Sequence, residues 1–150
     1  MRVVIQRVKR ASVKVDGECV GKVGKGLMLL LGVYAGDTEE QAEKLASKIS
    51  KLRIFSDENG KLNLSVSDIG GGALVVSNFT LCANYKHGNR PDYLSAEKPE
   101  RANELYEFFT EKLRSLIPGP AETGVFGADM ELEIINDGPV TIVMDSDELK

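Results

Sequence analysis

The sequence predicts an α+β domain built on a β-barrel-like antiparallel or mixed sheet, with two main helices. Three observations support this prediction. Segments of strand length, either apolar throughout or alternating, recur from the first residue to residue 144. Two longer segments, 37–52 and 99–116, place apolar residues at helical spacing. No repeat or linker interrupts the 150 residues, so we expect a single domain, residues 1–150.

The first third of the chain predicts three strands. Residues 1–9 alternate loosely, and two further short strands flank Asp16-Gly17, a strong signal for a two-residue hairpin. Residues 27–34 form a continuous apolar run, as expected for a strand buried on both faces. The intervening glycine-rich segment 21–26 lacks the Gly-Lys-Ser/Thr ending of a phosphate-binding loop, which argues against that motif.

Capping and turn residues set the expected limits of the helices. Asp37 can cap the first helix, and Glu40 completes a capping-box pattern three residues later. Pro99 suits the first turn of the second helix, which Pro118-Gly119-Pro120 ends. Short strands are expected on either side of a turn at Asn59-Gly60.

The segment 73–81, Ala-Leu-Val-Val-Ser-Asn-Phe-Thr-Leu, predicts a buried strand that carries polar groups near its end. On a strand, Ser77 and Phe79 would face one way and Asn78 and Thr80 the other. These groups need hydrogen-bond partners inside a fold, because an unpaired buried polar group costs about 1–3 kcal/mol. One interpretation is that they form the edge of an active site at the end of a rigid strand. The other is ordinary strand hydroxyl groups bonded to neighbouring backbone.

Gly138-Pro139 interrupts the last strand pattern, between residues 130–134 and 140–144. Proline cannot donate to a strand ladder, so the chain is expected to turn or to present its backbone there. Exposed carbonyl oxygens at such a position can hold an ammonium group. A plain hairpin turn is the alternative interpretation.

Composition narrows the classes of protein. Two cysteines, Cys19 and Cys82, and the single His87 stand in no metal-ligand spacing, so neither a metal site nor another cofactor is expected. The sequence shows no secretion-type leader and no apolar run near the ~18 residues of a membrane helix. We therefore expect a cytoplasmic protein that does not bind membranes.

Charge is unevenly distributed along the chain. The net charge is −4, yet residues 1–25 hold seven Lys/Arg against two Asp/Glu, and residues 121–150 hold one Lys against eight Asp/Glu. This asymmetry indicates either a basic face for an anionic partner or strand edges protected by lysines. A polar loop at 84–98 also carries Lys86, His87 and Arg90, and irregular loops of this length are often functional.

Several motifs together resemble the D-aminoacyl-tRNA deacylase family, also called D-tyrosyl-tRNA deacylases. In family order they are MRVVIQRV at 1–8, SNFTL at 77–81, GNRP at 88–91, TGVFGADM at 123–130 and NDGPVT at 136–141. Each motif is weak alone, but together they span nearly the whole chain. One departure is Asn78, because the family usually reads Ser-Gln-Phe-Thr at this motif.

The resemblance implies a homodimer with its active sites at the dimer interface. The catalytic segment would be Ser77, Asn78, Phe79 and Thr80, and Gly138 and Pro139 of the partner subunit would enter its pocket with a cis peptide bond. The family hydrolyses the ester between a D-amino acid and the 3′ adenosine of tRNA, and also accepts glycine. Gly-Pro carbonyl groups that hold the α-amino group would leave no room for an L side chain.

Two catalytic routes follow from these residues. Thr80 is a candidate nucleophile, although residues 77–81 offer no base to activate it. Alternatively, the terminal ribose hydroxyl of the tRNA or a positioned water assists, while the protein supplies orientation and backbone N–H groups near Phe79 and Thr80. Candidate tRNA contacts are Lys86, Arg90 and Arg7, and no DNA partner is expected.

Three other functions compete with this interpretation. A non-catalytic RNA-binding β module would use the same basic residues and release no product. A general small-ester hydrolase would not discriminate against L-esters. An enzyme that uses the Cys82 thiol is the third, although a single cysteine beside apolar residues is usually a packing residue.

Overall fold

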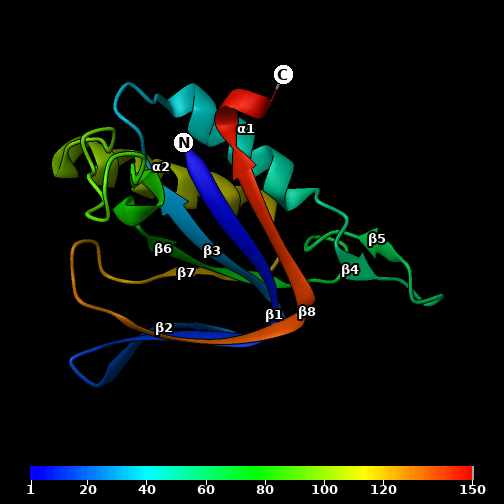
Figure 1. Ribbon diagram of the computed structural model, residues 1–150. Coiled ribbons are helices and arrows are strands. Elements are labelled where there is room, and N and C mark those ends of the chain that lie inside the picture. The colour runs from blue at the N-terminus through cyan, green and yellow to red at the C-terminus, as the bar shows by residue number, and fades with distance from the viewer. Residues whose placement is uncertain (150) are drawn as a thin grey trace.

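The computed structural model describes residues 1–149. A mixed sheet curls into a near-closed barrel, and two helices pack together on one side of it (Figure 1). The strands are β1 (Arg2–Val15), β2 (Glu18–Val23), β3 (Gly26–Gly32), β4 (Phe55–Ser56), β5 (Leu62–Leu64), β6 (Gly72–Ser77), β7 (Ala121–Thr123) and β8 (Glu131–Asp145). The helices are α1 (Glu39–Ser50), α2 (Pro99–Leu116) and the short 3₁₀ turns η1 (Phe79–Cys82) and η2 (Ser146–Glu148). The predicted α+β class with a barrel-like mixed sheet is confirmed.

The long strand β1 organises the sheet. The strand order is β2-β1-β3-β6-β7, with β8 paired to β1 along nearly its whole length and β4 paired only with β5. The pairs β3–β6 and β6–β7 are parallel and the others are antiparallel. The predicted hairpin is present, with positive φ at Asp16 (50°) and Gly17 (82°), as a twisted two-residue turn requires.

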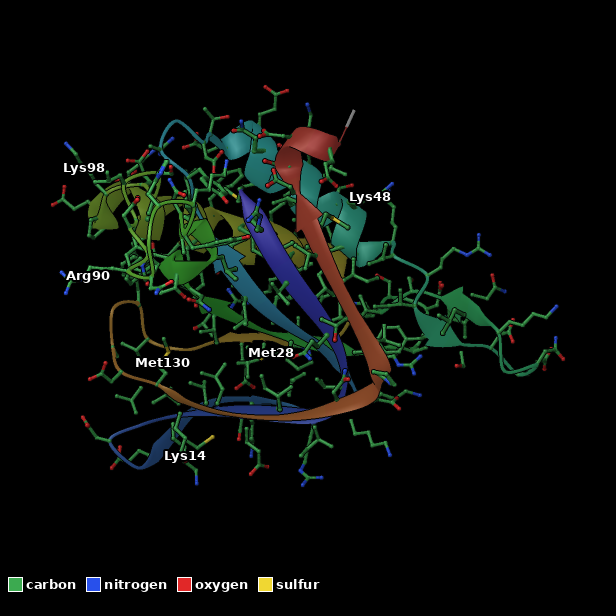
Figure 2. The ribbon with its side chains drawn as sticks, in the orientation of Figure 1. Lys14, Met28, Lys48, Arg90, Lys98 and Met130 are labelled. Carbon is green, nitrogen blue, oxygen red and sulfur yellow. The ribbon has the colours of Figure 1, made fainter. Side chains whose placement is uncertain are left out.

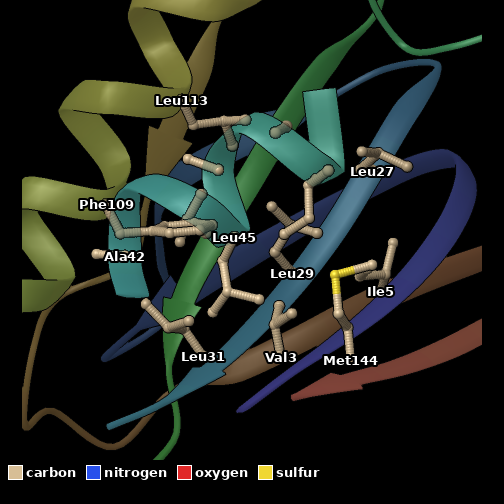
Figure 3. Packing of buried hydrophobic residues seen from close by; sticks show 14 of the residues in the cluster. Val3, Ile5, Leu27, Leu29, Leu31, Ala42, Leu45, Phe109, Leu113 and Met144 are labelled. Carbon is tan, nitrogen blue, oxygen red and sulfur yellow. The ribbon is translucent and has the colours of Figure 1, made fainter. Parts of the chain in front are cut away.

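Two apolar cores lie on opposite faces of β3 and β6. Leu27, Leu29 and Leu31 of β3 point toward the helices, where they meet Leu45 of α1 and Phe109 of α2 (Figure 3). The alternate side chains, such as Met28, point into the barrel. The continuous apolar run was therefore correctly predicted as a strand buried on both faces, because each face covers its own core.

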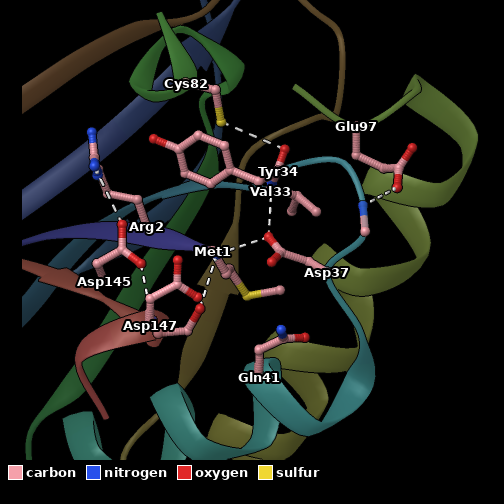
Figure 4. A network of polar contacts seen from close by, with 12 residues as sticks. Met1, Arg2, Val33, Tyr34, Asp37, Gln41, Cys82, Glu97, Asp145 and Asp147 are labelled. Carbon is pink, nitrogen blue, oxygen red and sulfur yellow. Dashed lines mark hydrogen bonds and ion pairs between the residues drawn. The ribbon is translucent and has the colours of Figure 1, made fainter. Parts of the chain in front are cut away.

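The start of α1 differs from the prediction. Thr38, not Asp37, is the N-cap residue, and Gln41 rather than Glu40 completes the capping box. Asp37 is instead buried, with Oδ2 2.8 Å from the Met1 ammonium nitrogen and accepting a 2.7 Å hydrogen bond from the Tyr34 N–H (Figure 4). A capping pattern in sequence could not reveal an ammonium group brought from the start of β1, which is why the prediction was one residue early.

The two segments singled out as polar interruptions were also placed differently. β6 ends at Ser77, and Phe79–Cys82 forms η1, so the predicted strand alternation across Thr80 is wrong. β8 instead runs without a turn through Gly138 and Pro139, where the ladder with β1 shifts register. The chain therefore bulges and presents its backbone there, and the plain hairpin turn is excluded.

Strand pairing brings the basic and the acidic segments of the chain together. The register sets the basic strand β1 against the acidic strand β8, with Lys14 opposite Glu131. Arg10 Nε lies 3.6 Å from a carboxylate oxygen of Glu133. This pairing argues against a basic face formed by β1. Because β1 is hydrogen-bonded to a strand on each side, it also argues against an open strand edge protected by lysines. Of the helices within residues 1–149, none is long and apolar enough to cross a membrane.

Candidate active site

A cavity of about 730 Å³ opens beside the carboxyl end of β6. Ser77, Asn78 and Phe79 line it from the end of the strand and the start of η1. The opposite walls come from segments 93–99, at the start of α2, and 126–132, at the start of β8. Ligands commonly bind just beyond the carboxyl ends of parallel strands, because helices and loops surround an open crevice there. Three residues of the predicted segment 77–80 therefore line a cavity, whereas Thr80 is not among its lining residues.

Two aromatic rings form part of the mouth of this pocket. Phe79 is 56% exposed although it follows a buried strand, and its ring meets that of Tyr93 edge to face, with centroids 5.0 Å apart. Exposed aromatic rings offer stacking surfaces for nucleic acid bases. Tyr93 was not among the predicted site residues, because nothing in the sequence showed that the 84–98 loop folds back over the pocket.

Thr80 and Asn78 are hydrogen-bonded to each other at the start of η1. The Thr80 hydroxyl donates to the side-chain oxygen of Asn78. An amide oxygen is not a base at neutral pH, so this bond orients Thr80 without activating it. The side-chain oxygen of Asn78 is thus already bound to a residue of the same segment, Thr80. The backbone N–H of Asn78 also donates to the Leu31 carbonyl oxygen (2.8 Å), which anchors η1 to β3.

Of the charged residues at the pocket, Glu97 is the one with a clear structural role. Its carboxylate accepts hydrogen bonds from the backbone N–H groups of Lys98 (2.8 Å) and Gly36 (3.2 Å). These bonds, that of Lys98 first, lower the pKa of Glu97 below its ordinary value. Glu97 is therefore a carboxylate at neutral pH that fixes the loop, rather than a proton donor for catalysis.

Cys82 faces away from this chemistry. It is buried, and its Sγ donates a weak bond to the Val33 carbonyl oxygen at 3.5 Å. Burial raises the pKa of the Cys82 thiol, so the unreactive protonated form prevails at neutral pH. This environment argues against a thiol enzyme. Within residues 1–149, no group of three or more His, Cys, Asp or Glu side chains is placed to hold a metal ion.

The Gly138–Pro139 peptide bond is cis, and both residues are exposed. Arg7 of β1 fixes the chain just before them. Its Nε donates to the Asp137 carbonyl oxygen and its Nη1 to that of Ile54, both at 2.8 Å. The side chain of Arg7 is only 12% exposed. Arg7 was predicted to contact tRNA, but its guanidinium instead binds the chain's own backbone.

The pocket and Gly138-Pro139 lie at opposite ends of the sheet within one chain. Val3 of β1 pairs with Leu31, which in turn pairs with Ser77 beside the pocket. Arg7, beside Gly138-Pro139, pairs with Leu27 four residues further along. At about 3.4 Å per residue, this separates the two features by about 14 Å along the strands. A single chain therefore does not bring the two predicted halves of the site together.

The remaining predicted cations lie in the 84–98 loop, whose last residues line the pocket. They are Lys86 and Arg90, both exposed and without an ion pair among residues 1–149. Arg90 and Lys98, which lines the pocket, project from the same side of the molecule (Figure 2). This side can meet an anionic partner without first breaking ion pairs.

Comparison with known proteins identifies the family. The sequence profile described as D-Tyr-tRNA(Tyr) deacylase matches residues 4–145. The chain belongs to this family. Curated relatives named D-aminoacyl-tRNA deacylase include one from Persephonella marina, 58% identical over 99% of this chain and 100% of the relative. Another, from Akkermansia muciniphila, is 55% identical over 97% of each chain.

Two solved structures share the fold of this chain. A protein named c-Myc DNA Unwinding Element Binding Protein is 44% identical, with a TM-score of 0.91 over 97% of this chain and 98% of its own. A probable eukaryotic D-amino acid tRNA deacylase has the same fold at 18% identity, with a TM-score of 0.81 over 95% of this chain and 97% of its own. The predicted family and the predicted enzyme class, a hydrolase, are confirmed by these relatives.

Proposed function

We propose that this protein hydrolyses the ester bond of D-aminoacyl-tRNA, and of glycyl-tRNA, and releases the free amino acid and tRNA. Family membership supports an aminoacyl-tRNA substrate. The observation that carries the proposal is the pocket at the end of β6, which combines exposed aromatic rings with hydroxyl and amide groups. The rings suit a terminal adenosine, and the polar segment 77–80 lies where its ester would be held.

The catalytic step in this proposal depends on positioning. The Thr80 hydroxyl has an amide rather than a base as its acceptor, so it is not an activated nucleophile. A water, positioned with the assistance of the neighbouring ribose hydroxyl, attacks the ester carbonyl carbon. The bond to the 3′ oxygen of the adenosine breaks, and that oxygen takes up a proton from the water, which gives the free amino acid and tRNA. Phe79 and Thr80 begin η1, where backbone N–H groups lack intrahelical acceptors and can stabilise the developing oxyanion. Ser77 and Asn78 hold the substrate in place.

Chiral selection is assigned to Gly138 and Pro139 of the partner subunit. Their exposed carbonyl groups would accept hydrogen bonds from the substrate ammonium group and block the position of an L side chain. Glycine has no side chain to exclude, so it would pass. The 14 Å separation within one chain supports a homodimer, because only a second copy can complete the pocket.

The proposed substrate also implies where the protein acts and which partners it binds. We place the protein in the cytoplasm as one deacylase domain, residues 1–150, that needs no cofactor and binds no membrane. Lys86 and Arg90 would contact tRNA phosphates. One relative is named for binding a DNA element, but the aminoacyl ester in this proposal is carried by the 3′ end of an RNA, and DNA lacks the ribose 2′-hydroxyl beside that ester. DNA is therefore expected to compete weakly with tRNA.

The deciding experiment is release of amino acid from D-Tyr-tRNA, L-Tyr-tRNA and Gly-tRNA by the purified protein without added metal. We expect rapid hydrolysis of the D-ester and the glycyl ester, with the L-ester spared. Equal hydrolysis of the two mirror images would instead indicate a general esterase. Binding of tRNA without any release would indicate a non-catalytic RNA-binding module.

A mixing experiment tests the cross-subunit site separately. Phe79→Ala should impair the pocket and Gly138→Ala the selecting motif, so each variant alone should be nearly inactive. After the two variants are unfolded and refolded together, mixed dimers would contain one site with both motifs intact. Recovery of about a quarter of the wild-type activity is expected, since half of the dimers are mixed and each has one intact site. No recovery, or a monomer with full activity, would refute the homodimeric site.

A further inference from the structure

A second, smaller cavity lies on the other side of η1 from the pocket. It has a volume of about 320 Å³ and is lined chiefly by Arg2, Tyr34, Asn84, Tyr85, Lys86 and Ser95. Phe79, at one end of η1, lines the pocket, whereas Cys82, at the other end, lines this cavity. Four residues of 3₁₀ helix at about 2 Å each measure about 6–8 Å. This length is about two steps of a stacked nucleic acid strand, at about 3.4 Å per step, so the neighbouring nucleotide of an unstacked single strand can span it.

Two cations border the cavity. Arg2 is held by three contacts: its Nη1 donates to the Leu81 carbonyl oxygen (3.4 Å), its Nη2 lies 3.3 Å from Asp145, and its guanidinium lies 5.6 Å from the Tyr34 ring centroid. Its Nε is buried and has no hydrogen-bond partner among residues 1–149. Asp145 offsets part of the Arg2 charge, but the exposed ammonium of Lys86 adds a second positive charge. The cavity therefore favours an anion.

The hydroxyl groups of the cavity suit the same kind of ligand. Burial raises the pKa of Tyr34, so its phenol stays protonated at neutral pH. Its hydroxyl has only a long contact, 3.5 Å, to the Leu81 carbonyl oxygen. Ser95 lines the same cavity. Phosphate oxygens accept hydrogen bonds from such groups as well as from Arg and Lys.

Tyr85 stands next to these cations with its ring open to solvent. It is 76% exposed, although a tyrosine usually buries part of its ring. A reciprocal pair of backbone hydrogen bonds between Asn84 and Asp92, 2.8 and 2.9 Å, fixes the base of the loop that carries it. Between those two residues the chain has Lys86, His87 and Arg90 and no acidic residue. The loop thus presents an aromatic ring in a positively charged setting.

We propose that this cavity is a second nucleotide subsite, which binds the RNA nucleotide preceding the terminal adenosine. Its phosphate lies between Arg2 and Lys86, and its base stacks on Tyr85. The subsite rests on the proposed function, because it assumes that the terminal adenosine occupies the pocket beside Phe79. It adds affinity for the single-stranded 3′ end without taking part in ester cleavage.

The test compares two small substrates that differ by one nucleotide. These are the D-tyrosyl ester of adenosine and the D-tyrosyl ester of the dinucleotide CpA. The wild-type protein should show a kcat/KM at least tenfold higher for the dinucleotide ester. Tyr85→Ala and Lys86→Ala should each reduce this ratio at least threefold, whereas Tyr85→Phe, which keeps the ring, should retain it. Lys61→Ala, at the exposed turn before β5, is the matched loss of a lysine and should leave the ratio unchanged.

Salt dependence gives a second readout for Lys86. For a single-stranded ligand, each phosphate contact contributes about 0.7 to the slope of log affinity against log salt. Lys86→Ala should lower that slope by about this amount for CpA binding, measured by calorimetry, and leave it unchanged for adenosine. If neither small ester is hydrolysed fast enough to measure, the affinities for CpA and adenosine are compared in place of the two kcat/KM values.

The outcomes separate the subsite from the proposed function. Equal kcat/KM and equal binding for the adenosine and dinucleotide ligands in the wild-type protein would overturn the subsite. The subsite would also be overturned if the variants lowered kcat/KM for both esters by the same factor, because the ratio of dinucleotide to adenosine ester would then be unchanged. Absence of D-specific hydrolysis of full-length aminoacyl-tRNA would instead overturn the proposed function.

Discussion

The two ends of the sheet are built in opposite ways. At the Gly138-Pro139 end, the Arg7 side chain binds two backbone carbonyl groups, and the Asn136 amide group donates to the carbonyl oxygens of Arg7 (2.9 Å) and Val140 (3.1 Å). At the pocket end, Thr80 and Phe79 are exposed, and the Thr80 hydroxyl bonds only to its neighbour Asn78. One end is a braced backbone element, and the other leaves its side chains free for a ligand.

This difference matches the tasks that we assign to the two ends. An element that excludes an L side chain must not yield, because exclusion fails once the backbone moves by about 1 Å. A pocket that receives a flexible RNA end gains from exposed rings and open hydrogen-bonding groups. The comparison predicts that substitutions at the braced end should change selectivity and stability, whereas those at the pocket end should mainly change rate.

The largest effect is expected for Gly138→Ala. An added Cβ would collide with the backbone nitrogen of Val140, so the motif must shift. A displacement of about 1 Å commonly costs about a hundredfold in rate, and we expect such a loss in kcat/KM for the D-ester. Gly24→Ala is the matched control, because a Cβ there meets nothing within 4 Å. Unchanged kcat/KM in Gly138→Ala would remove the motif from the site.

Arg7→Ala should follow, with about a thirtyfold loss of kcat/KM and weaker discrimination between D- and L-esters. The carbonyl groups of Asp137 and Ile54 would lose their donor, so the free energy of unfolding should fall by about 2 kcal/mol. Urea denaturation measures the stability, and ester release measures the selectivity. Lys9→Ala, an exposed cation two residues away, should change neither. A loss of stability with intact selectivity would make the bracing purely structural.

Thr80→Ala should have a smaller effect, about tenfold on kcat. This corresponds to the ~1.4 kcal/mol of one orienting hydrogen bond. The backbone N–H groups of Phe79 and Thr80 would remain in place, so catalysis should persist. Single-turnover hydrolysis of D-Tyr-tRNA measures the effect. Complete loss of turnover with intact tRNA binding would instead restore Thr80 as the nucleophile.

The smallest effect is expected for Glu97→Gln at the pocket end. The folded-state pKa of Glu97 is lowered from its ordinary value of 4.5, so its stabilising effect is fully present above that pH. The effect is lost as pH falls through the lower folded-state value. The difference in urea midpoint between wild type and Glu97→Gln should therefore be small at pH 7 and vanish under more acidic conditions. A difference that grows as pH falls would contradict the assigned hydrogen bonds.

Local signals in the sequence determined much of the fold. The apolar runs identified β3 and most of β6, Asp16-Gly17 placed the first hairpin, and Pro99 marked the start of α2. These signals succeed because hydrophobic periodicity and turn chemistry act between neighbours in the chain. The sequence motifs also identified the family and singled out the segment 77–80 and Gly138-Pro139 as special.

Tertiary structure decided what depends on residues far apart in the chain. Asp37 left its expected capping role because the Met1 ammonium lies beside it, and Arg7 turned to the Asp137 carbonyl group because β8 pairs with β1. Tyr93 reached the pocket only because its loop folds back. The 14 Å between the two halves of the site likewise follows from strand register, which local sequence does not encode. The sequence thus determined which residues matter, and long-range pairing determined what each one touches.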